Sequence, residues 1–216
     1  LFRSPLSNFP VFDYNQLATD CRQEVLANVI ECAMPATATV VDPFDGHPYQ
    51  GHWGLAPQWA TAPLDAAGRK WVTGCVIQRL NAYGVHVPIL LEGANPAIAY
   101  SPSFDAQYPF DESTAWGDLF AKTLIGPPPV YVCWDQDLSN LCPITSPQSP
   151  AWWLNLRICD TSPNCGLHLM GPCAQNCTMG GDASPYWSCK NPNGSTAVET
   201  VHVQLLPQTS CSFPTH

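Results

Sequence analysis

The chain has 216 residues, of which 45% are hydrophobic and 11% aromatic, a composition that predicts a folded protein with a substantial core. Only 12% of the residues are charged, and 17 Asp and Glu against 8 Lys and Arg give a net charge of −9. Binding to nucleic acid or to an anionic membrane surface requires clustered cations, so we expect neither partner. No apolar run approaches the roughly 18 residues of a spanning helix, so we also expect no membrane span.

Eleven cysteines indicate the compartment in which the chain works. Thiols at this density belong to disulfides in an oxidising compartment, whereas in a reducing one they belong to metal sites. The chain starts at Leu1 rather than Met, as expected after removal of a signal peptide. We therefore expect a secreted, extracellular or cell-envelope protein in which most cysteines are oxidised.

The first half of the chain predicts two helices. The first opens at Asp13, which forms a capping-box pattern with Gln16, and stops before Pro35. The second opens at Asp65 and stops at Gly84, a residue that suits a left-handed helix cap. Cys32 and Cys75 lie on the apolar stripes of these helices, so they can pair if the helices pack together.

Strands and loops fill the rest of the prediction. Short alternating runs predict strands, and the one that contains Pro88 suits the edge of a sheet. We expect an α+β fold in which a helix-containing part, residues 1–100, packs on a cysteine-rich part of strands and loops, residues 101–216, as one unit. The predicted strands are 38–41, 85–91, 130–134, 152–158 and 201–205, with loops at 42–59 and 93–115 and a short helical turn at 116–124.

An odd number of cysteines leaves at least one outside the intramolecular disulfides, and Cys21 on the first helix is the candidate. The pairing of the eight cysteines after residue 130 is left open. The apolar segment 1–12 is expected to pack on a second copy of the chain, giving a homo-oligomer or filament, or to fold back on its own domain. The cysteines expected in disulfides are Cys32, Cys75, Cys133, Cys142, Cys159, Cys165, Cys173, Cys177, Cys189 and Cys211.

The loop DPFDGHPYQGHWG holds the best metal-ligand candidates in the chain. His47, His52, Asp42 and Asp45 offer two imidazoles and two carboxylates to a divalent metal. The alternative is an ordinary solvated loop, where Asp and His are common for turn-forming reasons. We expect no other cofactor. A zinc pattern in residues 165–177 is better explained by disulfides.

Glu112 and Asp118 flank an aromatic residue in the segment FDESTAWGDLF. A pair of carboxylates beside an aromatic wall is what glycoside hydrolysis requires, so the two residues are candidates for a catalytic acid and base. Helix capping or simple surface exposure is the alternative interpretation.

In the segment AWWLNLRIC, alternation places Trp152 in the core and Trp153, Asn155 and Arg157 together on the opposite face. An exposed indole flanked by hydrogen-bonding side chains is typical of a sugar-stacking platform or a protein contact. The alternative is that a neighbouring loop covers Trp153.

Residues 54–93 and 116–189 resemble a group of exported, cysteine-rich proteins of myxobacteria and related bacteria. The resemblance is carried by GLAPQW, AAGRKWVTGCVIQRLNAYGVHVPILLEG, AWGDLF and CGLHLMGPCAQNC followed by YWSC. It implies a bacterial envelope or extracellular setting and brings no catalytic residues with it.

Three functional hypotheses follow from the sequence. The first is a non-enzymatic extracellular structural or interaction protein that assembles with itself or binds a surface polysaccharide. The second is a secreted polysaccharide hydrolase that uses Glu112 and Asp118. The third is a metal-binding protein that uses His47 and His52. Residues suited to chemistry are few and scattered, which favours the first.

Overall fold

The structure is a computed structural model that describes residues 19–42, 45–81, 87–121, 128–135, 150–159, 165–180 and 186–206. The segment 1–12, Cys142 and Cys211 lie outside these residues. Cys21 lies in the first helix, but its side chain falls outside the described part. The expectations for these residues therefore stay predictions.

The first part of the chain forms helices and a small hairpin. Helix α1 (Thr19–Ala33) is followed by β1 (Thr39–Val41) and β2 (Pro48–Gln50), which pair antiparallel, and by the short helix η2 (Pro57–Ala60). Helix α2 (Ala66–Arg79) begins after Asp65, whose side chain accepts a hydrogen bond of 2.6 Å from the Gly68 amide, as predicted. It ends at Arg79, earlier than the predicted Gly84.

A disulfide ties the two helices together, because Cys32 of α1 and Cys75 of α2 have Cα atoms 5.9 Å apart and bonded sulfurs. This confirms the predicted pairing. Both cysteines are fully buried in one hydrophobic core that also contains Ile30, Trp59 and Val72.

A five-stranded sheet forms the centre of the molecule, in the order β3-β10-β4-β5-β6. Its pairs are antiparallel except for β5 and β6, which run parallel. The predicted strands at 130–134 and 201–205 are confirmed, and so is the edge position of the strand near Pro88, which is β3. Strand β4 occupies residues predicted as the end of the loop 93–115 and the start of the helical turn 116–124. The strands are β3 (Ile89–Glu92), β4 (Phe110–Gly117), β5 (Val130–Trp134), β6 (Leu167–Pro172) and β10 (Thr200–Leu205), and the short helices η3 (Pro96–Ile98) and α3 (Pro102–Asp105) lie between β3 and β4.

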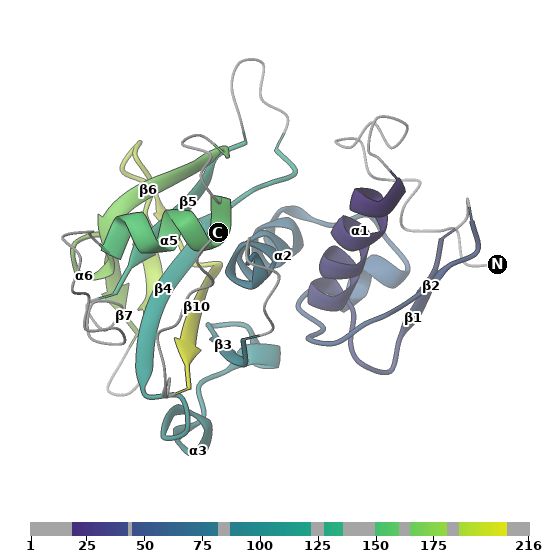
Figure 1. The fold of residues 1–216 in the computed structure, drawn as a ribbon, viewed down its shortest axis with the longest axis horizontal. Coiled ribbons are helices and arrows are strands. Elements are labelled where there is room, and N and C mark those ends of the chain that lie inside the picture. The colour runs from purple at the N-terminus through teal and green to yellow at the C-terminus, as the bar shows by residue number, and fades with distance from the viewer. Residues whose placement is uncertain are drawn as a thin grey trace.

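Two helices cover one face of this sheet. Helix α2 lies between the sheet and α1, and α5 (Pro150–Cys159) lies over β5 and β6 (Figure 1). Alternate residues of the strands point at these helices, among them Ala115, Val132 and Val201, all fully buried. At Gly74 of α2 an added Cβ would come 2.7 Å from a Val201 methyl, so glycine permits the close approach of helix and sheet.

The segment predicted as a strand at 152–158 is helix α5, so that prediction is wrong. Leu154 and Ile158 are four residues apart, lie on one helical face and are both buried. Trp152, expected in the core, is 40% exposed. The apolar residues of this segment fit both a two-residue and a four-residue spacing, and packing on the sheet selects the helix.

The opposite face of the sheet carries two of the four disulfides found among the described residues. A three-stranded sheet of β7 (Cys177–Met179), β8 (Tyr186–Lys190) and β9 (Thr196–Ala197), with the short helix α6 (Cys173–Asn176), contributes to a core around Trp116 on this side. Disulfides join Cys133 to Cys173, Cys177 to Cys189, and, at the end of α5, Cys159 to Cys165. The fold is therefore α+β, with a helical first part and a disulfide-stapled second part.

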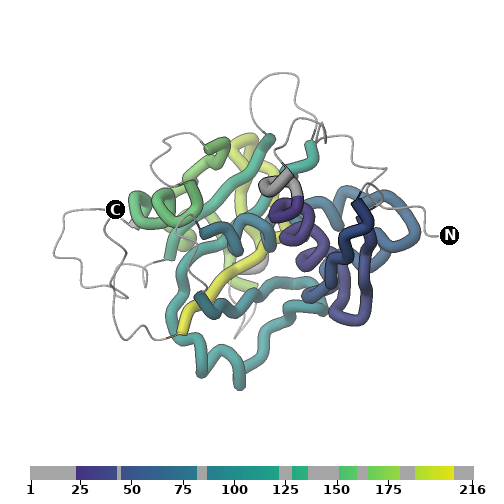
Figure 2. Tube along the Cα trace, turned by 45° about the vertical axis from the view of Figure 1, so that its right-hand side comes forward, coloured from purple at the N-terminus to yellow at the C-terminus, as the bar shows by residue number. Residues whose placement is uncertain are grey.

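Strand β10 lies between β3 and β4, next to the edge of the sheet, although it is the last strand among the described residues. Figure 2 shows this yellow strand running among the teal strands of the middle of the chain. The sheet thus includes β3 from residues 1–100 and four strands from residues 101–216. Among the residues that the structure describes, no helix has the length and apolar character to cross a bilayer.

Arg157 of α5 joins the helices to the sheet. Its Nη1 donates to the backbone oxygens of Gln78 and Leu80, at 3.1 and 2.7 Å, at the C-terminal end of α2. Its Nη2 donates to the Glu112 carboxylate of β4 at 2.7 Å. The side chains of Arg157 and Glu112 are only 17% and 6% exposed, so this is an ion pair in the interior.

We expect the substitution Arg157→Met to lower the free energy of unfolding by about 3–5 kcal/mol, because it leaves the Glu112 carboxylate buried without a counter-charge. The matched control is Arg69→Met, which removes a 3.0 Å ion pair between Asp118 and a side chain that is 38% exposed. That control is expected to cost about 1 kcal/mol or less. Urea unfolding of both variants gives the comparison, and equal losses would contradict the role assigned to Arg157.

Candidate functional site

The structure does not bring the predicted catalytic carboxylates together. Glu112 lies within β4, on the side of α2 and α5, where it is bound by Arg157. Asp118 follows the end of the same strand, where it pairs with Arg69 and accepts a hydrogen bond from the Phe120 amide. Six residues along a strand correspond to roughly 20 Å, whereas glycosidase carboxyl pairs lie about 5–9.5 Å apart. Both residues therefore have structural partners, and their role as a catalytic acid and base stays a prediction.

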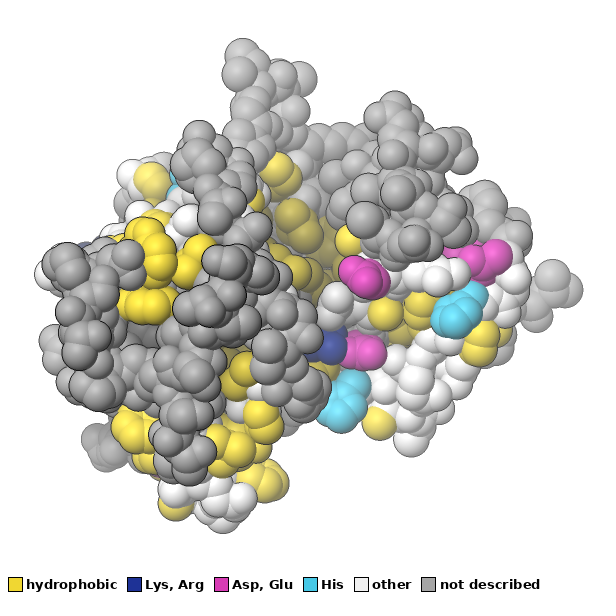
Figure 3. All heavy atoms as spheres, viewed as in Figure 1, with side chains coloured by type: hydrophobic (Ala, Val, Ile, Leu, Met, Phe, Trp, Pro, Cys, Tyr) yellow, Lys and Arg dark blue, Asp and Glu magenta, His cyan; other side chains and the backbone are white. Residues whose placement is uncertain are grey.

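The predicted metal-binding residues of the β1–β2 region are not gathered around one point. His47 contacts the ring of Tyr49, with centroids 4.8 Å apart, and His52 contacts Trp53 at 4.3 Å. Figure 3 shows histidine side chains at two separate places on the face that carries α1 and the hairpin. Asp42 is buried, whereas Asp45 is exposed. No group of three or more His, Cys, Asp and Glu side chains within the described ranges has a metal-binding arrangement.

The predicted contact surface at Trp153, Asn155 and Arg157 does not form, because these residues lie on a helix. Positions two apart on a helix do not share a face, and Arg157 points into the interior. Trp153 is partly buried and packs edge-on against Trp152, with ring centroids 4.8 Å apart. Trp152 is the more exposed of the two, so the expected burial of these two rings is reversed.

A surface pocket of about 350 Å³ lies between α1 and β2. One wall comes from the exposed side of α1, and the other comes from β2 and the residue before it. Glu31 in this pocket pairs with Arg79 of α2, whose guanidinium lies 4.7 Å above the Trp53 ring. The lining residues are Gln23, Glu24, Ala27, Glu31, His47, Pro48, Tyr49 and Gln50.

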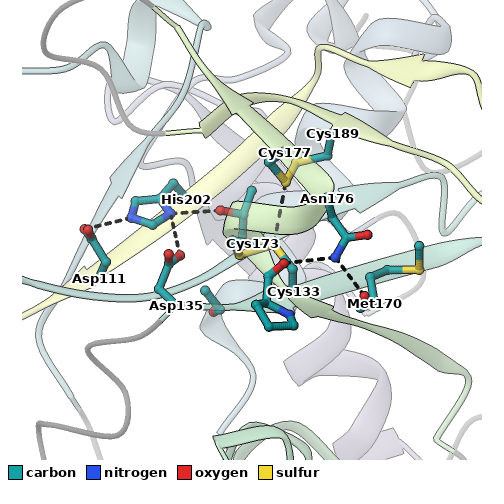
Figure 4. The surroundings of a disulfide bond; sticks show 12 residues. Asp111, Cys133, Asp135, Met170, Cys173, Asn176, Cys177, Cys189 and His202 are labelled. Carbon is teal, nitrogen blue, oxygen red and sulfur yellow. Dashed lines mark hydrogen bonds and ion pairs between the residues drawn. A yellow bond between two sulfur atoms is a disulfide. The ribbon is translucent and has the colours of Figure 1, made fainter.

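A buried polar cluster around His202 was not predicted from the sequence. His202 lies on β10, where it alternates with Val201 and Val203 of the core on the helix side and so lies on the opposite face. Figure 4 shows its ring pointing toward Asp111 and Asp135. Its Nε2 lies 3.0 Å from Asp111 Oδ1, and its Nδ1 lies 2.9 Å from Thr114 Oγ1 and 3.9 Å from Asp135 Oδ2. Since a carboxylate only accepts hydrogen bonds, Nε2 donates to Asp111.

A β-bulge between β10 and β4 determines to which face of the sheet Asp111 and Glu112 point. Val203 pairs with Ser113, but Gln204 pairs with Asp111, so Glu112 has no partner across the ladder. The bulge directs Asp111 to His202 while Glu112 and Ser113 both bond on the helix side. Burial by itself would raise the pKa of Asp111, but the His202 imidazole and the Gln204 amide hold it below its usual value.

Glu92 of β3 is a third acid of this cluster, after Asp111 and Asp135, and lies directly across from His202 in the sheet. It is 1% exposed, and neither carboxyl oxygen has a hydrogen bond of normal geometry. Burial raises the pKa of Glu92 to about 7, with further upward contributions from Asp105 and Asp111. The His202 imidazole and the nearby Ser101 amide act in the opposite direction.

The order hydroxyl, imidazole, carboxylate in Thr114, His202 and Asp111 is that of a hydrolase triad. Thr114 and His202 are both 0% exposed, however, so a substrate has no route to the hydroxyl in this conformation. The cluster acts as the polar lining of the sheet. A sequence signal for it does exist, because Thr200, His202 and Gln204 alternate with apolar residues along β10.

Comparisons of the chain with protein-family models, with curated proteins and with solved structures give no match. A functional proposal for this protein therefore depends on the pocket, the buried cluster and the disulfides themselves.

We expect the wild-type protein to lose stability as the pH rises and Glu92 ionises, and we expect Glu92→Gln to remove this loss. A carboxyl whose pKa is raised from 4.5 to about 7 by folding favours the folded state fully below pH 4.5, and this contribution is lost between pH 4.5 and 7. The variant should match the wild type near pH 4 and exceed it at pH 8 by up to about 3 kcal/mol. Urea unfolding at pH 4, 6 and 8 measures the difference. Glu24→Gln on the exposed face of α1 is the control, and parallel pH profiles for wild type and Glu92→Gln would contradict the prediction.

Proposed function

We propose that this chain is an extracellular, non-enzymatic interaction protein that binds a polysaccharide in the pocket between α1 and β2. The observation that carries the proposal is a contrast between two sets of polar groups. In the pocket, the exposed side chains of Glu24 and His47 present hydrogen-bonding groups to solvent. The groups suited to catalysis are instead engaged with other parts of the protein, as Glu112 is with Arg157 and His202 with Asp111.

The disulfides support the extracellular setting. Each of three disulfides joins different secondary-structure elements, and together they reach from α1 to β8. Cross-links of this kind persist in oxidising compartments and are reduced in the cytosol. The same setting is implied by the resemblance to exported bacterial proteins.

The lining of the pocket favours a ligand rich in hydroxyl groups. Sugar hydroxyls both donate and accept hydrogen bonds, and the Glu24 carboxylate and the His47 imidazole offer partners to them. The Gln50 amide instead holds the pocket wall in place, because it is bonded to Thr39 and to the Ala36 and Ala38 carbonyls. The exposed His47 ring, which packs on the buried Tyr49 ring, adds a surface for the carbons of a sugar. Two glutamates in the lining and a net charge of −9 repel polyanions, so the expected polymer is neutral or carries amino sugars.

The double substitution Glu24→Ala and His47→Ala is expected to weaken polysaccharide binding at least about tenfold, since each residue contributes about 1 kcal/mol of hydrogen-bond or ring contact. Both residues are exposed, so folding should be unchanged. Affinity electrophoresis through gels that contain a soluble glucan, glycol chitosan or alginate measures binding to a neutral, a cationic and an anionic polymer.

The matched control for this test is Gln107→Ala, an exposed amide that is hydrogen-bonded to the Ser103 carbonyl of its own turn. The control should keep wild-type retention. Retention only in alginate, or retention in glucan or chitosan that survives the double substitution, would contradict the proposal.

A further inference from the structure

Two disulfides lie in contact on the face of the sheet away from α2. Cys133 is bonded to Cys173 and Cys177 to Cys189, and the Sγ atoms of Cys133 and Cys177 are only 3.6 Å apart (Figure 4). The short helix α6 connects the two disulfides, since Cys173 begins it and Cys177 follows it. The Asn176 side chain closes this turn by donating to the Met170 and Pro172 carbonyls at 2.8 and 2.9 Å.

The four cysteines differ in their access to solvent. Cys133, Cys173 and Cys189 are each 0% exposed, whereas Cys177 is partly exposed. Thiol–disulfide exchange requires a thiolate to reach a sulfur of the target bond, so a thiol from outside meets Cys177 first. The Cys133–Cys173 bond is shielded from direct attack, but one of its sulfurs touches Cys177.

We propose that these four cysteines form a thiol–disulfide exchange site that accepts two electrons from an external dithiol at Cys177 and relays them inward. The state that results has a single disulfide between Cys133 and Cys177, with Cys173 and Cys189 as thiols. The observations that carry the proposal are the contact between the two sulfurs and the difference in burial.

The exchange proceeds in three balanced steps. A thiolate of the dithiol attacks Cys177 Sγ, which breaks the bond to Cys189 and leaves Cys189 as a thiolate that takes up a proton. The second thiol of the reagent loses its proton and attacks the first sulfur, so that the dithiol leaves as a cyclic disulfide and Cys177 becomes a thiolate. Cys177 then attacks Cys133 Sγ, forms the Cys133–Cys177 bond and expels Cys173, which is protonated in turn.

The exchange changes which elements are joined covalently. In the oxidised form β8 is bonded to β7 through Cys189, and β5 is bonded to α6 through Cys173. In the rearranged form β5 is joined to the start of β7, and β8 is held by its hydrogen bonds, including the one of 3.0 Å from Trp116 Nε1 to Asn191. The rearranged site thus holds the Cys173 and Cys189 thiols in the interior, behind the partly exposed Cys177 sulfur. By the reverse exchange it can reduce a disulfide of another molecule.

The first test is limited reduction of the wild-type protein with dithiothreitol. Samples are quenched in acid, alkylated with N-ethylmaleimide and mapped by tandem mass spectrometry, with fragmentation between residues 173 and 177. The expected two-electron product carries a Cys133–Cys177 link and alkyl groups on Cys173 and Cys189. A product alkylated on Cys177 and Cys189 that keeps the Cys133–Cys173 link would overturn the proposal.

A second test generates the Cys177 thiol without a reductant. The substitution Cys189→Ser should cause loss of the Cys133–Cys173 link in favour of Cys133–Cys177 in purified protein. Its control is Cys165→Ser, which frees Cys159 and should leave the Cys133–Cys173 link unchanged. Retention of Cys133–Cys173 in the Cys189→Ser variant would count against the relay, and the test on the wild-type chain stands even if a variant fails to fold.

Discussion

The guanidinium group of Arg157 fixes the positions of three elements at once, and much of the structure depends on it. It supplies hydrogen bonds to the last carbonyls of α2, which have no partners within their own helix. It also neutralises Glu112 at the β-bulge of β4. Gln78 extends the network, because its amide donates to the backbone oxygens of Ser113 and Val201 and accepts from the Ser113 hydroxyl. The helices therefore cannot shift over the sheet without breaking bonds in the interior.

The same bulge connects the chemistry of the two faces of the sheet. It turns Glu112 toward Arg157 on one face and Asp111 toward His202 on the other. Apart from the network of Gln78, Ser113, Glu112 and Arg157, the core on the helix face is apolar. The opposite face holds acids, a histidine and two disulfides in contact. Polar groups are thus concentrated where the sheet is covered by cross-linked segments rather than by a large apolar core.

Local sequence patterns predicted those features of the fold that depend on residues close together in the chain. The helix cap at Asp65 and the pairing of Cys32 with Cys75 follow from helical spacing and are confirmed. Helix α5 was missed because its apolar residues fit two periods, and only packing of Leu154 and Ile158 on the sheet decides between them. His202 contacts Asp111 and Thr114, which lie 91 and 88 positions earlier in the chain. The alternation along β10 is visible in the sequence, but contacts over such distances are not. Glu112 and Asp118 show the reverse case, because residues that are close in sequence along a strand lie apart in space.

The position of β10 has a consequence for how the molecule is made. Ribosomal synthesis delivers β3 and β4 long before residues 200–205, and the space between these two strands is filled by β10 alone. Until then each has an edge whose amide and carbonyl groups lack their final partner, and such edges pair readily with other chains. The pairing of β3 and β4 with β10 can therefore form only after residues 200–205 are made, through contacts between residues far apart in the chain, which is a slow route. Until then, the facing edges of β3 and β4 are the places where a nascent chain of this protein is open to pairing with other chains.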